Sequence, residues 1–162
     1  MAKRKTKKSN KQLIFLATIL GLVAVCMIFL PAFQYGETSF TGLKSAFGYT
    51  EKSDGIIFVS AKILEINLLT LVAYLLPLGG IVVALLSKKS NMLTIISAVL
   101  FIVAGACGFF SVTTFSGSII GSNLVSLNWQ LAYGIIISAI CSLLAGLIMI
   151  VKIFLNNNSF TN

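Results

Sequence analysis

Four long apolar runs constrain this chain more than any other feature. They cover residues 13–33, 67–86, 92–112 and 131–151, and we place the helical spans at about 13–33, 62–87, 92–112 and 131–152. Each contains about the 20 apolar residues that a helix needs to cross roughly 30 Å of hydrocarbon. Because lipid offers no hydrogen bonds to the backbone, such runs should be helical. We therefore predict an all-α membrane protein, a four-transmembrane-helix bundle over residues 13–154 with a small ordered outer loop between spans one and two.

The composition supports a chain that lies partly in lipid. Of its 162 residues, 57% are hydrophobic and only 10% are charged. Soluble domains carry about 25% charged residues. The chain therefore has too little polar surface to cover a water-soluble globule of this length.

The first run has one alternative interpretation, a cleaved signal peptide. Basic residues precede it, but the run is longer than the roughly 7–15 apolar residues of a signal peptide. The segment "VAVC" before Cys26 resembles a lipoprotein signal only weakly, since Val25 is a poor residue before a modified cysteine. We expect an uncleaved span.

The basic residues predict the orientation. Nine would lie on the side of the termini, and only Lys44, Lys52 and Lys62 on the other; the nine are Lys3, Arg4, Lys5, Lys7, Lys8, Lys11, Lys88, Lys89 and Lys152. Lys and Arg concentrate in short cytoplasmic loops. We therefore expect a solvated, disordered basic tail at 1–12 and a second tail at 155–162, both cytoplasmic, an outer loop at 34–61, and a plasma-membrane location.

The charge pattern also bears on partners. Half of the basic residues lie in the first tail, before the first span, so the net charge of +8 does not indicate nucleic acid. The expected partners are membrane lipids, and either another membrane protein or further copies of the chain. The tail can also attract anionic lipid.

The outer loop carries its own pattern. Phe40, Leu43 and Phe47 have helical spacing, Thr41 is a candidate N-cap, and Gly48 follows the end. The next apolar segment, "GIIFVSA", fits either a strand or the start of a long second helix beginning near Lys62. Aromatic residues of the loop are expected at the membrane surface, as are two that flank span four: Tyr35, Phe40, Phe47, Tyr49, Trp129 and Tyr133.

Small residues recur every four positions in the fourth run. Gly134, Ser138, Ser142 and Gly146 form this row. Small side chains let membrane helices approach closely, which supplies packing energy that lipid exclusion does not. We predict a helix-packing seam here, with a partner helix either in the same chain or in a second copy.

The second run contains Pro77 in "LPLGG". Proline removes a helical hydrogen bond and crowds the preceding turn, so we predict a kink there. If the protein were a pore, its lining would include Asn67, Thr70, Tyr74 and Pro77 on this helix.

The sequence offers little support for a catalytic site or for a metal site. The chain has no histidine, and Cys26, Cys107 and Cys141 lack metal-ligand spacing. The acidic residues, Glu37, Glu51, Asp54 and Glu65, match no calcium loop. We expect no cofactor and no enzyme activity. A Ser–Lys pair is not expected either, because no lysine lies near an intramembrane serine in the predicted spans.

The segments "FLPAFQYG", "TGLKSAFGY" and "SKKSNMLTIISAVLFIVAG" together resemble a recurring type of small bacterial four-span membrane protein. The resemblance covers most of the chain and implies a bacterial plasma membrane without a particular activity. The topology is also similar to that of claudins, but their loop signature of Trp, Gly-Leu-Trp and two Cys is absent.

These observations favour a non-enzymatic interaction or structural protein of the membrane. The alternative is a small transporter or channel component. A membrane enzyme would be favoured only by lipid bound against Glu65 or Asp54.

Overall fold

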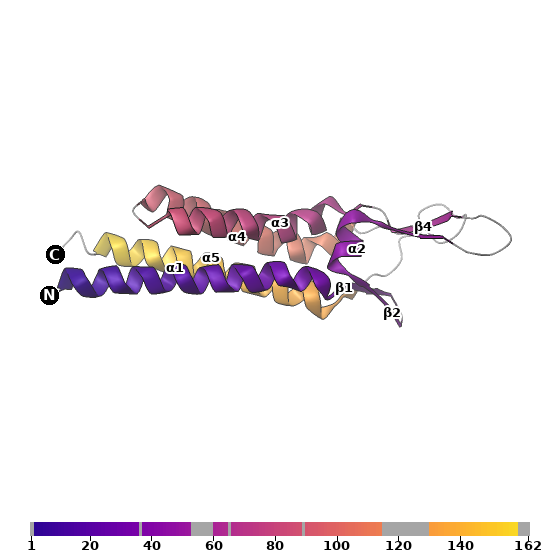
Figure 1. Cartoon of the computed structure of the whole chain (residues 1–162), viewed down its shortest axis with the longest axis horizontal. Helices are drawn as coiled ribbons and strands as arrows, with labels where there is room; N and C mark the ends of the chain where they lie inside the picture. Colours follow the sequence, from indigo (N-terminus) through magenta and orange to yellow (C-terminus); the bar gives the residue numbers. More distant parts are fainter. Residues whose placement is uncertain are drawn as a thin grey trace.

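A computed structural model of the chain describes residues 2–35, 37–52, 60–64, 66–88, 90–114 and 130–158. Four long helices run side by side as an antiparallel bundle, with both termini at one end (Figure 1). They are α1 (Ala2–Cys26), α3 (Leu68–Leu86), α4 (Asn91–Phe110) and α5 (Tyr133–Asn158). Each is long and apolar enough to cross a membrane, which confirms the predicted fold class.

The helices form a closed ring of neighbours. Helix α1 packs against α3 and α5, and α4 packs against the same two helices from the other side. Alanines make up most of the first core cluster, together with Phe101 and Met149. Large apolar side chains point outward along all four helices, as expected where the surrounding solvent is lipid. The protein is therefore a multi-pass membrane protein.

The two ends of the bundle differ. At one end, which we call the turn end, a short turn joins α3 to α4 and both chain termini lie nearby (Figure 1). At the other, the cap end, the chain forms a small folded layer, the cap. It contains the 3-10 helix η1 (Met27–Phe29), β1 (Pro31–Tyr35), β2 (Thr38–Thr41), α2 (Gly42–Phe47), β3 (Tyr49–Lys52), β4 (Ser60–Leu64), η2 (Ser111–Thr114) and β5 (Gln130–Leu131).

The cap has two small antiparallel sheets. One has the order β2-β1-β5, so a strand that precedes α5 pairs with the strand that follows α1, with Phe33 opposite Leu131. The other is the hairpin β3–β4. Phe33 is buried with Tyr74 and Ile135 in a second core cluster, which joins the first sheet to the bundle.

Helix α2 is a predicted element that the structure confirms. Thr41 caps it by accepting a hydrogen bond from the Lys44 amide at 3.4 Å. Gly48 ends it with φ 79°, a backbone conformation that costs glycine little.

Several predicted boundaries are wrong. Residues 31–33 are not the end of span one but the start of β1. The second span begins at Leu68 rather than near Lys62, because 60–64 form a strand and the Asn67 side chain caps α3. The first tail is helical from Ala2 rather than disordered, since Lys and Gln are good helix formers. Helix α5 continues through 155–158. Asp54, Glu65 and Trp129 lie outside the described residues.

Candidate functional site

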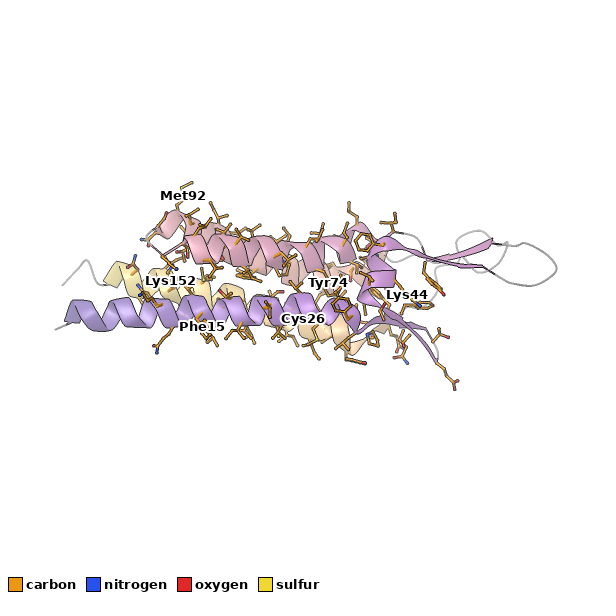
Figure 2. All side chains as sticks on the ribbon, in the orientation of Figure 1. Phe15, Cys26, Lys44, Tyr74, Met92 and Lys152 are labelled. Atoms are coloured by element: carbon orange, nitrogen blue, oxygen red, sulfur yellow. The ribbon has the colours of Figure 1, made fainter. Side chains whose placement is uncertain are left out.

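The most distinctive chemical group in the bundle is Lys152 at the turn end (Figure 2). Its side chain is only 4% exposed. Its Nζ donates hydrogen bonds to the Ser87 carbonyl oxygen at 2.8 Å, to Ser87 Oγ at 2.9 Å and to Thr94 Oγ1 at 2.9 Å. We call these three residues the lysine cluster.

Local structure explains how the cluster forms. Helix α3 ends at Leu86 with Ser87 as its C-cap, and α4 begins after Ser90, whose side chain caps it. Helix α5 is longer than its neighbours and runs past this turn, so Lys152 faces it from inside the bundle. The last carbonyls of a helix carry partial negative charge and favour a nearby cation. The cluster thus joins three helices at one point.

The number of hydrogen-bond acceptors around Lys152 matches the number of donors of its charged form. Ser87 Oγ donates its own proton to the Ala84 carbonyl at 2.6 Å, and Thr94 Oγ1 donates to the Ser90 carbonyl at 3.0 Å. Neither hydroxyl has a proton left for the lysine. All three contacts therefore use lysine N–H groups, and an ammonium has three such donors.

The cluster corrects two sequence-based expectations. Lys152 is not a solvated residue at the boundary of span four, and a lysine does lie beside a buried serine. A lysine that activates serine must be neutral and accept the hydroxyl proton. Here the Ser87 proton points to Ala84 instead. The geometry is that of a structural link between helices.

A second polar group lies at the cap end. The Asn67 side chain accepts from the Thr70 amide at 3.0 Å and donates to the Ser111 carbonyl at 3.2 Å. It also lies 3.4 Å from Thr114 Oγ1. One side chain therefore ties the start of α3 to the end of α4.

Three buried hydroxyls have no hydrogen-bond partner within the described part of the chain: Thr70, Tyr74 and Ser142. Tyr74 lies beneath α2, where a Cβ added to Gly42 would come within 2.8 Å of its hydroxyl. Asn67, Thr70, Tyr74 and Pro77, the lining suggested for a pore, all face the bundle interior.

The interior midway along the bundle is closed by Phe101. Its ring is fully buried between glycines of two other helices. A Cβ on Gly21 would lie 2.8 Å from the ring, and one on Gly80 would lie 3.0 Å from it. These distances leave no room for a methyl group beside the ring.

The four small residues of α5 are all buried, and their neighbours change along the helix. A Cβ on Gly134 would lie 2.5 Å from the Pro31 carbonyl oxygen. Ser138 Oγ donates to the Ala24 carbonyl of α1 at 2.8 Å. A Cβ on Gly146 would meet Ile102 of α4 at 2.7 Å. The row thus contacts α1 near the cap and α4 near the turn, within one chain.

The remaining predicted residues take simpler positions. Pro77 is buried within α3. Lys88 is exposed at the turn end, and Lys89 lies outside the described residues. Within the described ranges, His, Cys, Asp and Glu form no group of three that could hold a metal ion. Tyr133 is exposed at the cap end of α5.

Comparisons with protein-family models, with curated proteins and with solved structures found no match.

Proposed function

We propose that this protein is a non-catalytic membrane protein that presents its cap to a protein partner. The observation that carries the proposal is the hairpin β3–β4, which extends beyond the end of the bundle (Figure 1). The proposed location is the plasma membrane, with both termini cytoplasmic and the cap outside, because basic residues are concentrated at the turn end.

The cap is held to the bundle at several points, so the hairpin has a firm base. Strand β5 pairs with β1, and the Gly42 amide donates to the Leu30 carbonyl at 3.0 Å. Helix α2, which leads directly into β3, packs against α3 and η1. A partner that binds the hairpin would therefore be held in a defined place relative to the membrane.

The hairpin itself is suited to adding a strand. Within the described residues it consists of β3 and β4 alone, paired with Thr50 opposite Lys62 and Glu51 opposite Ala61. A two-stranded ribbon has an open edge on each side and is only marginally stable by itself in water. Open edges pair readily with a strand from another chain. A strand of the partner would complete the hydrogen bonding.

Photocrosslinking in native membranes tests the proposal. A photoreactive phenylalanine analogue is placed at Thr50 or at Lys62, on the two strands of the hairpin. The control carries it at Phe110, an exposed residue at the cap end of α4. We expect a protein adduct of defined mass from the hairpin positions and lipid adducts from the control. An adduct of twice the chain's mass would identify a second copy as the partner. Absence of any protein adduct from both hairpin positions would contradict the proposal.

The alternative, a small transporter or channel component, has less support. The suggested pore lining faces an interior that Phe101 fills, with glycines packed against its ring. A path through a single chain would require this packing to open.

A further inference from the structure

Helix α2 exposes apolar side chains although it is only six residues long. Gly42, Ser45 and Ala46 form its buried face. Leu43 and Phe47 lie four residues apart, on one side of the helix, and are 44% and 59% exposed. Two large exposed apolar groups on one side of so short a helix favour an apolar environment beside it.

The backbone fixes α2 at the depth where the apolar spans end. The Gly42 amide donates to the Leu30 carbonyl, and a Cβ on Gly42 would lie 2.8 Å from the Ile28 carbonyl oxygen. The apolar span of α1 and η1 ends at Phe29. Helix α2 therefore begins level with the end of this span, and it lies across the bundle axis (Figure 1).

Helix α2 lies beside elements of the bundle that already expose apolar side chains. Helix α2 packs against η1 and α3. Phe29 of η1 is 70% exposed, and Leu68 at the start of α3 is similarly exposed. Both residues belong to apolar spans. Leu43 and Phe47 thus add exposed apolar side chains to a cap element that packs against the ends of two spans.

A basic residue completes the pattern. Lys44 lies at the cap end (Figure 2) and is exposed. It follows Leu43 in the sequence, and its ammonium lies 4.1 Å from the centre of the Tyr49 ring. Lysine at a membrane boundary extends its charge toward the headgroups while its methylenes remain in apolar surroundings. Aromatic rings also favour this zone.

We propose that α2 is an interfacial helix bound to the lipid leaflet at the cap end. Leu43 and Phe47 enter the boundary between headgroups and acyl chains, and Lys44 contacts lipid phosphate. A helix in this position fixes the cap at a set depth. The inference requires only that the bundle spans a membrane, so it does not depend on the proposed protein partner.

Fluorescence quenching by brominated lipid tests the proposal. Trp129, the chain's single tryptophan, is replaced by Phe, and one tryptophan is introduced at Phe47 or, as a second variant, at Leu43. Phe29→Trp is the lipid-facing control, and Ser39→Trp, exposed on β2, is the solvent-facing control. The full chain is reconstituted in phosphatidylcholine vesicles with bromine placed near the headgroup end of the acyl chains.

We expect Phe47→Trp and Leu43→Trp to be quenched by bromine as Phe29→Trp is, with blue-shifted emission. Ser39→Trp should instead be quenched by acrylamide in the water. If the two α2 variants behave like Ser39→Trp, the proposal is wrong. Adding Lys44→Glu to Phe47→Trp should reduce the bromine quenching, because a carboxylate repels the phosphate. Unchanged quenching would overturn the contact between Lys44 and phosphate.

Discussion

At the scale of single residues, the lysine cluster shows how a lysine is held between membrane helices by neutral oxygen acceptors of the described residues. Three neutral oxygens of Ser87 and Thr94 accept the three protons of Lys152, and the end of α3 supplies partial negative charge. Removing one acceptor leaves a donor of the ammonium buried and unpaired, which costs more than losing an ordinary hydrogen bond.

A double-mutant cycle should detect this coupling. Thr94→Val removes one acceptor of Lys152 while keeping the side-chain shape, and should lower stability by about 1–3 kcal/mol. In a Lys152→Met background, Thr94→Val should lower the free energy of unfolding by less. The difference, which is the coupling between Thr94 and Lys152, should be at least about 1 kcal/mol. Stability is measured by thermal or denaturant unfolding in mild detergent.

Thr18→Val is the matched control for this cycle. The Thr18 hydroxyl donates to the Ile14 carbonyl at 2.8 Å, as Thr94 donates to Ser90, but lies in another helix. It should show no coupling to Lys152→Met. If Thr18→Val and Thr94→Val were coupled equally to Lys152→Met, the hydrogen bond between Thr94 and Lys152 would make no specific contribution to stability.

The helical pattern of the sequence predicts in part that Lys152 is buried. Ala145, Met149 and Lys152 have helical spacing and lie on one buried face of α5. Ending the fourth span at 152 placed the lysine at a solvated boundary, because the apolar run stops there. Its acceptors could not be predicted, since Ser87 is 65 residues away in sequence and only the packing brings them together.

At the scale of helices, small residues determine how closely the spans approach. Two adjacent glycines of α3 provide a direct comparison. A Cβ on Gly80 would lie 3.0 Å from the buried Phe101 ring, whereas one on Gly79 would have only Leu100 nearby, at 3.8 Å. The same substitution therefore meets tight packing at one position and ordinary contact at the next.

We predict that Gly80→Ala destabilises the bundle by about 1–3 kcal/mol, the usual cost of overpacking. Gly79→Ala should cause no loss, because alanine favours the helix over glycine. Thermal unfolding in detergent compares the two, with membrane insertion measured separately. The packing account would be wrong if Gly79→Ala were the more harmful change.

The row of small residues on α5 gives a second prediction. Ser142 is fully buried, and Ser142→Leu should destabilise the chain by about 1–3 kcal/mol through overpacking. Leu144, which is exposed on the same helix, should accept Ile with a smaller loss. Unfolding measurements on both variants test this. Loss of an oligomer without loss of monomer stability would place the critical contact between copies instead.

The spans and α2 followed from local patterns, whereas β1 and β5 did not. Thr41 and Gly48 mark the ends of α2 by their own backbone preferences. Strand β1 was missed because "PAF" continues an apolar run, and its pairing with β5 depends on residues about 100 positions apart. Strand β5 is two residues long, so periodicity cannot identify it.

At the scale of the whole molecule, the bundle has chemically different ends. The turn end carries Lys88 and both termini, close to the lysine cluster, and the cap end carries the strands. The basic residues of the sequence concentrate at the turn end. If positive charge is retained in the cytoplasm, the cap faces outward, where it can meet a partner.

Cysteine labelling in intact cells tests this orientation most directly. Cys26, Cys107 and Cys141 are replaced by Ala or Ser, and a single cysteine is introduced at Glu37 in the cap or at Lys88 in the turn, both exposed. A membrane-impermeant maleimide should label position 37 in intact cells and position 88 only after permeabilisation. Labelling of position 88 in intact cells, with position 37 protected until permeabilisation, would contradict the account.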